Sequence, residues 1–71
     1  MLELLDLFLI YCAATSGMCV ETRPVIEPPL TQFSDCELAG RAGDPKFQAR
    51  HPDWHLRAFT CAVHQATQLP V

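Results

Sequence analysis

Residues 2–12, with the sequence LELLDLFLIYC, decide the fold because they are apolar at every position except Glu3 and Asp6. The aromatic and β-branched residues in the second half of this segment favour a β-strand. A strand that is buried on both faces has such a continuous apolar sequence. A helix would also gather leucines and Cys12 on one face, and periodicity alone does not separate the two. We favour the strand, with the helix as the alternative.

The same apolar start has a second interpretation, as a cleaved secretory leader. Residues 7–14 would be its apolar segment, and the small residues at 13–17 its cleavage site. Acidic residues stand where such a leader carries Lys or Arg, and bulky Tyr11 before Cys12 does not fit a lipoprotein signal. The run is also shorter than the ~20 residues that cross a bilayer. We expect the segment to stay in the fold, and we expect no membrane span.

A turn and a second strand follow the apolar run. The sequence TSG at 15–17 is a turn signal, and CVETRPVI at 19–26 looks like a strand. Pro24 has no N–H to donate to a neighbouring strand, so this strand belongs at an edge of the sheet or ends there. The pattern predicts a β-hairpin over residues 1–26.

A helix is expected over residues 34–50. Ser34 and Glu37 have the spacing of a capping box, in which Ser34 is the N-cap. Asp44 and Pro45 would suit the start of a second short helix, as its N-cap and first residue. One interrupted helix and two consecutive helices are therefore both open.

The last strand is expected at residues 54–63, WHLRAFTCAV, followed by a polar tail at 64–71. In simple alternation Trp54 and Phe59 would point to opposite faces of the sheet. A bulge near Arg57-Ala58 would bring the two rings to the same face.

These elements make one domain, residues 1–71, because the chain is too short for a second core. The order predicts an α+β fold of the type β-β-α-β, with one small antiparallel or mixed sheet and one helix packed on it. The aromatic residues that we expect to anchor the core are Phe8, Phe47, Trp54 and Phe59.

The net charge of −3 and the scattered cations limit the partners. Nucleic-acid binding needs a basic stripe that displaces counterions from phosphates, and the sequence has none. It also lacks the basic amphipathic helix that recruits proteins to membrane surfaces. We expect protein partners and no cofactor.

The chain has four cysteines, at Cys12, Cys19, Cys36 and Cys61. A domain of this size is marginally stable without cross-links, and an even cysteine count indicates two disulfides. Cys12 and Cys19 flank the hairpin turn, whereas Cys36 lies in the first helical turn and Cys61 late in the last strand. Of the three connectivities we favour Cys12–Cys19 with Cys36–Cys61. Disulfides imply an oxidising environment or a particle surface, such as a periplasm or a virion.

Zinc binding and buried free thiols are the alternative roles for these cysteines. His51, His55 and His64 would add zinc ligands, but the cysteines lack the paired short spacings of zinc sites. Free thiols would be small core residues. The sequence indicates no metal site.

A cysteine nucleophile is a further alternative, with Cys61 and His64, or Cys36 and His51, as thiolate and base. The sequence implies neither a third residue to orient the base nor an oxyanion site. We expect no catalytic residues.

The stretch FQARHPDWHLRAFTC, residues 47–61, resembles a family of small four-cysteine bacterial and phage-like proteins. The matching positions are Cys12, Cys19, Cys36, Phe47, His51, Pro52, Trp54, Phe59 and Cys61. Phe47 and Phe59 stand where tryptophan is commoner in that family, and Asp44-Pro45 interrupts the helix. The resemblance implies a disulfide-tied β-β-α-β fold and brings no activity with it.

We therefore expect a non-enzymatic structural or interaction protein, an accessory or decoration-type subunit of a larger assembly such as a phage-like particle. An exported, disulfide-stabilised binding or inhibitor domain is the first alternative. A zinc-dependent adaptor is the second.

Overall fold

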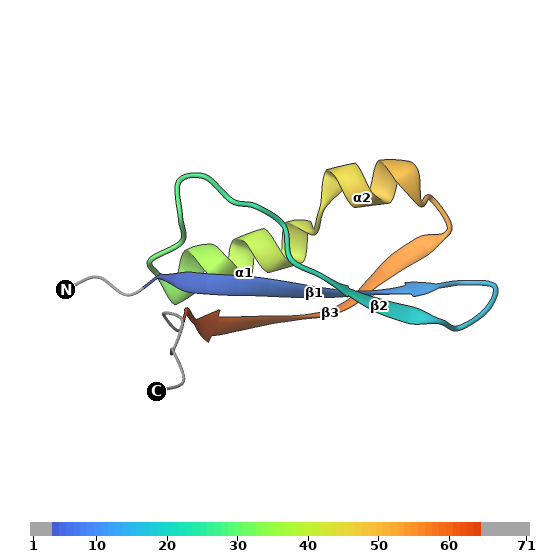
Figure 1. The fold of residues 1–71 in the computed structure, drawn as a ribbon, viewed down its shortest axis with the longest axis horizontal. Coiled ribbons are helices and arrows are strands. Elements are labelled where there is room, and N and C mark those ends of the chain that lie inside the picture. The colour runs from blue at the N-terminus through green and yellow to red at the C-terminus, as the bar shows by residue number, and fades with distance from the viewer. Residues whose placement is uncertain (1–3, 65–71) are drawn as a thin grey trace, which may run out of the picture.

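A computed structural model describes residues 4–64. The elements are β1 (Leu5–Ala13), β2 (Cys19–Thr22), α1 (Phe33–Ala42), α2 (Pro45–Arg50) and β3 (Trp54–Val63). The strands form one antiparallel sheet in the order β2-β1-β3, and the helices pack on one side of it (Figure 1). This confirms the predicted α+β fold. Residues 1–3 of the predicted hairpin and residues 65–71 of the predicted tail lie outside the described residues.

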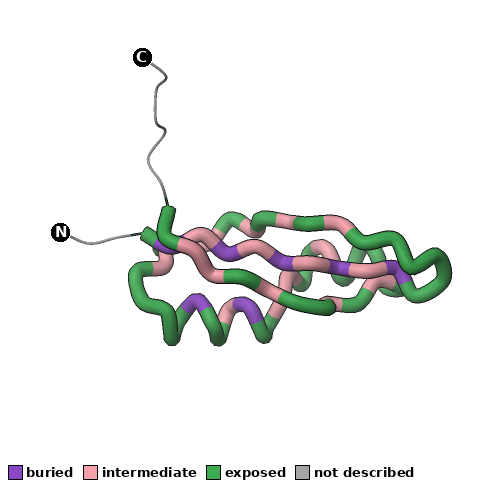
Figure 2. The backbone as a smooth tube through the Cα atoms, turned by 90° about the horizontal axis from the view of Figure 1, so that it is seen from below, coloured by how far each residue is buried: buried purple, intermediate pink, exposed green. Residues whose placement is uncertain are grey.

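The central strand β1 supplies most of the core. Its buried residues are Leu5, Leu7, Leu9, Tyr11 and Ala13, and they alternate with half-buried ones along the strand (Figure 2). The expectation that β1 is buried on both faces is therefore wrong, because the helices cover only one face of the sheet. The continuous apolar run leaves Phe8 and Ile10 on the uncovered face.

Phe8 is not the core anchor that we predicted. Its ring lies under the Arg23 guanidinium, 5.3 Å from the carbon of that group. The other three predicted anchors, Phe47, Trp54 and Phe59, are half-buried and pack against the core. The Phe47 ring centroid lies 4.5 Å from that of Tyr11 and 6.0 Å from that of Trp54.

The predicted bulge in the last strand is confirmed. Ile10 pairs with Ala58 and Tyr11 pairs with Leu56, so Arg57 is the extra residue on β3. This extra residue restores the alternation, and Trp54, Leu56, Phe59 and Cys61 are all half-buried on the helix side.

The second strand is shorter than predicted. It ends at Thr22, and residues 23–30 leave the sheet as an extended segment that we call the strap. The strap returns to the sheet at Leu30, whose carbonyl oxygen accepts a hydrogen bond of 2.8 Å from the N–H of Leu5. Pro24 cannot donate to β1, which accounts for the early end of β2.

The predicted capping box at the start of the first helix is wrong. The helix begins at Phe33 with Gln32 as its N-cap, and no side chain caps it. The Cys36 N–H donates to the Gln32 carbonyl oxygen at 3.1 Å, which places Ser34 inside the first turn. Glu37 pairs instead with Arg41, one turn later.

The second helix begins as the sequence predicted, with Asp44 as its N-cap. The Asp44 carboxylate accepts hydrogen bonds from the N–H groups of Lys46, at 3.1 Å, and Phe47, at 3.3 Å. Pro45 occupies the first helical position, so the helical region is two consecutive helices.

Two disulfides tie these elements together. Cys12–Cys19 joins β1 to β2 across a pair of opposite residues, and Cys36–Cys61 joins α1 to β3. This is the pairing that the sequence favoured. Because Cys36 is fully buried, its bond to Cys61 lies inside the core, whereas Cys19 is exposed.

Gly40 allows α1 to approach the sheet. It is buried, and a Cβ atom at this position would overlap the ring of Phe59. Alanine is a better helix former than glycine by about 1 kcal/mol. Overpacking costs about 1–3 kcal/mol, and overlap with three ring atoms of Phe59 places the cost in the upper part of this range. After subtraction of the helix-propensity gain, we expect Gly40→Ala to lower the free energy of unfolding by about 1–2 kcal/mol in urea titrations. Ser34→Ala, on the exposed side of α1, is the control for helix propensity alone. A Gly40→Ala variant as stable as the parent would contradict this contact.

Candidate functional site

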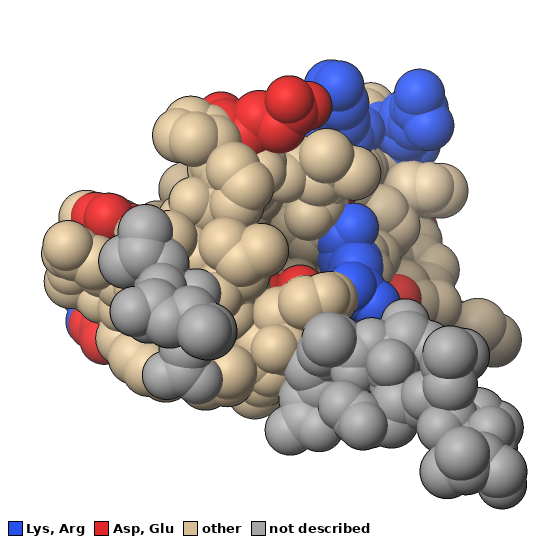
Figure 3. All heavy atoms as spheres, turned by 60° about the vertical axis from the view of Figure 1, so that its left-hand side comes forward, with Lys and Arg blue, Asp and Glu red and all other residues tan. Residues whose placement is uncertain are grey.

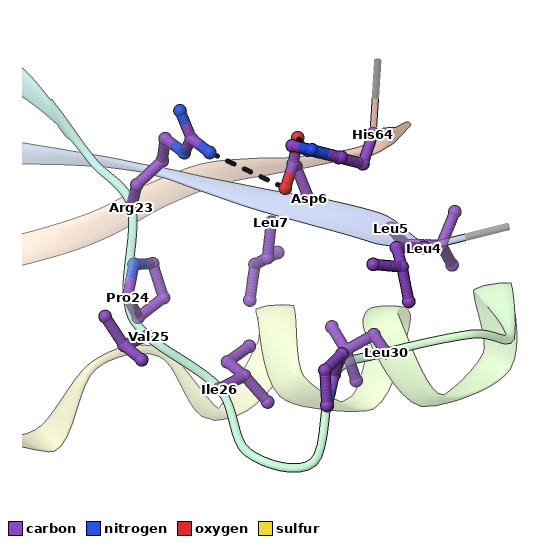
Figure 4. Close-up of a pocket in the computed structure, with 11 residues that line it drawn as sticks. Leu4, Leu5, Asp6, Leu7, Arg23, Pro24, Val25, Ile26, Leu30 and His64 are labelled. Carbon is purple, nitrogen blue, oxygen red and sulfur yellow. Dashed lines mark hydrogen bonds and ion pairs between the residues drawn. The ribbon is translucent and has the colours of Figure 1, made fainter. Parts of the chain in front are cut away.

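The strap forms one wall of the larger of two hollows in the described chain that it borders. Its side chains alternate, with Ile26 and Leu30 packed against the core and Val25 88% exposed. Figure 4 shows Leu7 on β1 and Ile26 on the strap pointing toward one another. The apolar contacts hold the strap against β1, and Val25 is left at the surface.

Between the strap and the helices lies a groove of about 740 Å³. We define this groove by its lining, which consists of residues 23–27 of the strap, Leu7 on β1, Ala39 and Ala42 at the end of α1, and residues 43–47, Arg50 and His51 in and around α2. Most of these side chains are apolar. The volume lies within the range of about 300–1,000 Å³ that is typical of ligand sites.

The junction between the two helices is held in place beneath the groove. The buried Tyr11 hydroxyl accepts a hydrogen bond of 2.7 Å from the N–H of Asp44. Gly43 ends α1 with a φ of 76°, and a Cβ atom there would come 2.7 Å from the same hydroxyl. Only glycine readily combines this backbone with so close an approach to Tyr11, so a side chain at position 43 would disturb the junction.

Basic side chains surround the apolar lining. Arg23, Lys46 and Arg50 line the groove, although the chain has only five Lys and Arg residues and a net charge of −3. Two carboxylates also line it, and one of them, that of Asp44, caps α2. Figure 3 shows one face of the molecule, on which basic side chains lie at the upper right, next to acidic ones, and near the centre.

Two of these cations are not engaged in an ion pair, although two carboxylates line the same groove. Among residues 4–64, neither Lys46 nor Arg50 forms an ion pair. Arg23 lies 3.6 Å from Asp6, and its side chain is largely exposed. The groove can therefore offer positive charge to a bound molecule at both of its sides.

A smaller hollow of about 530 Å³ lies on the other side of the strap (Figure 4). Asp6 is its polar centre: the His64 Nδ1 atom lies 2.8 Å from one carboxylate oxygen, and Arg23 approaches the other. This cluster links the start of the strap to β1 and to the end of β3. The contacts of Asp6 with His64 and Arg23 hold these elements together.

The cysteine–histidine pairs considered from the sequence are not brought together as catalysts. Cys36 and Cys61 are bonded to each other, so neither is a thiolate. His51 packs against Phe47, with ring centroids 4.6 Å apart, and His64 contacts Asp6. In the part of the chain that the structure describes, no three ligand-type side chains are grouped for a metal ion.

The groove was not predicted from the sequence. Residues 23–26 were expected to be the end of a strand, and the cations are scattered along the chain. The only local indications of the groove were Pro24, which ends the strand early, and the apolar residues that follow it.

Neither α1 nor α2 has the length and apolar character that a membrane-spanning helix needs.

Cleavage near Ala14 is incompatible with this fold. It would remove β1, which is the central strand and carries most of the buried side chains. The exported alternative therefore requires that residues 5–13 stay in the chain.

Comparison of the chain with family models, curated protein sequences and solved structures found no match. The resemblance to small four-cysteine bacterial and phage-like proteins stays a prediction. The groove is therefore the feature of the molecule from which we infer a function.

Proposed function

We propose that this protein is a small, non-enzymatic interaction module that docks on a partner protein as an accessory subunit of a larger assembly, such as a phage-like particle. The observation that carries the proposal is the groove between the strap and the helices, where basic side chains surround an apolar lining. An oxidising environment or a particle surface suits the two disulfides.

The groove has the composition of a docking surface. Its apolar residues offer area to bury, and the exposed Val25 adds to it. The disulfides and the hydrogen bond between Tyr11 and Asp44 hold the elements that form its walls. A rigid surface loses little conformational entropy on binding, which favours affinity.

The basic side chains of the groove indicate which kind of peptide would bind in it. Arg23 on the strap and Lys46 and Arg50 on α2 would pair with carboxylates, while the lining between them would take apolar side chains. The proposed partner segment is therefore a peptide that combines Asp or Glu with residues such as Leu or Phe.

The test uses labelled peptides in which acidic and apolar residues alternate, with peptides of the same apolar residues and lysines for comparison. We expect only the acidic set to bind, with an affinity that falls as salt is added. Arg50→Glu should weaken binding at least about tenfold, a difference of 1.4 kcal/mol. Arg57→Glu carries the same charge change on the bulge of β3, away from the groove, and should stay within about twofold. Equal binding of both peptide sets, or equal effects of both variants, would refute the proposal.

A further inference from the structure

The outer edge of β3 carries a regular row of backbone groups that point away from the sheet. The His64 N–H donates to the Leu4 carbonyl oxygen at 2.7 Å, which makes residues 4 and 64 a hydrogen-bonded pair. Because such pairs alternate along an antiparallel ladder, the N–H and C=O groups of Phe59, Cys61 and Val63 point outward. Within residues 4–64, no strand pairs with this edge.

This edge lacks the usual protection against pairing. Residues 58–63, AFTCAV, have no charge, no proline and no glycine, and several of them favour strands. Edge strands are commonly blocked by charged residues, proline, bulges or short length. The bulge at Arg57 lies in the first half of β3, and residues 58–63 keep a regular register with β1.

The opposite edge of the sheet is blocked. Strand β2 has four residues, and Glu21 and Arg23 place charges on it or next to it. The strap then covers the rest of β1 on that side, through Leu30. The sheet of the described residues, 4–64, therefore has one open edge, which suits a closed pair of molecules better than a filament.

Helix α1 carries an exposed aromatic side chain on its flank above the open edge of β3. Ala39 and Ala42 on one flank of α1 line the groove, and Gly40 lies over Phe59. Helix geometry then places Phe33 on the other flank, above the open edge, and its side chain is 58% exposed and outside the core. An exposed aromatic ring at this place would be buried by a second molecule.

We propose that two copies of this chain pair antiparallel along β3, centred on Cys61, and join their sheets into one. In this register Phe59 of each copy lies opposite Val63 of the other, and no like charges face one another across the pair. Helix α1 packs across both β1 and β3. With strands ~4.8 Å apart, the two α1 axes would be about 10 Å apart, a normal packing distance for helices.

Sedimentation equilibrium across a concentration series tests the pairing. We expect the mass to rise with concentration from 7.9 kDa to twice that value. Val63→Pro removes an outward N–H that makes no bond within the molecule, and it should raise the dimer dissociation constant at least about tenfold. Val63→Thr keeps this N–H and is the matched control, which should dimerise like the parent.

Amide hydrogen exchange gives a second readout that does not depend on a variant. In the dimer, the amides of Phe59 and Cys61 should become protected as concentration rises, whereas those of Thr60 and Ala62 are bonded to β1 in either state. A chain that stays at 7.9 kDa up to about 1 mM, with fast exchange at Phe59 and Cys61, would overturn the proposal and leave this edge for a strand of another protein.

Discussion

Replacing Cys36 or Cys61 with serine is expected to unfold the domain or to leave it barely stable, with a loss of ~2–5 kcal/mol. The bond joins α1 to β3 across 25 residues of sequence and is the covalent link between the helices and the sheet in the described structure. Its loss would free a long loop in the unfolded chain and leave a hydroxyl or thiol in a fully buried place. The free energy of unfolding of a small domain is only a few kcal/mol, so this loss is close to all of it.

Urea unfolding of the serine variants measures this effect, and mass spectrometry of the untreated protein checks the bonds, with ~4 Da less than the fully reduced chain. The matched control is serine at both Cys12 and Cys19, whose separation is 7 residues. Loop-closure entropy predicts about 2.4 kcal/mol for that short loop and about 3.5 kcal/mol for the long one. If Cys36→Ser unfolds at the same urea concentration as the parent, the bond is not what holds α1 to the sheet.

Leu9→Ala is expected to have the second large effect, a loss of about 2–5 kcal/mol. Leu9 is 0% exposed and lies at the middle of β1, between β2 and β3. Truncation would remove apolar contacts and leave a cavity that the neighbouring strands cannot close, because both are bonded to β1.

Ile10→Ala is the control for this prediction, since Ile10 is the next residue and lies on the uncovered face of the sheet. Its truncation should cost less than about 2 kcal/mol, because the side chain is only half-buried. Chemical denaturation of both variants, analysed with a common slope, gives the comparison. An equal or larger loss for Ile10→Ala would mean that the buried face of β1 has been assigned wrongly.

Local patterns in the sequence were enough to predict the elements and their order. The last strand has the predicted bounds, 54–63, because it starts after a proline turn and is rich in strand-forming residues. Asp44-Pro45 marked the start of α2, since an N-cap and its following proline act on neighbouring backbone groups. The bulge was predictable because one extra residue was needed to bring two aromatic rings to one face.

Two of the wrong predictions concern contacts with distant parts of the chain. Ser34 has the right spacing for a cap, but the chain enters α1 earlier, after the contact between Leu30 and β1. Phe8 is as apolar as Leu7 and Leu9, and only the position of the helices decides which of them is covered. The early end of the strand after Cys19 is different, because it follows from a local signal, Pro24, which cannot donate to β1.

For this protein, composition and spacing were sufficient to predict a small α+β fold and its strand–strand–helix–strand order. They also favoured the disulfide pairing that the structure has, Cys12–Cys19 with Cys36–Cys61. These properties depend on neighbours in the chain and on loop lengths, which can be read along the sequence. The buried face of β1, the path of the strap and the meeting of Arg23 with Lys46 and Arg50 around one groove were decided only by the packed structure. They depend on which faces are covered in three dimensions, and residue spacing does not contain that information.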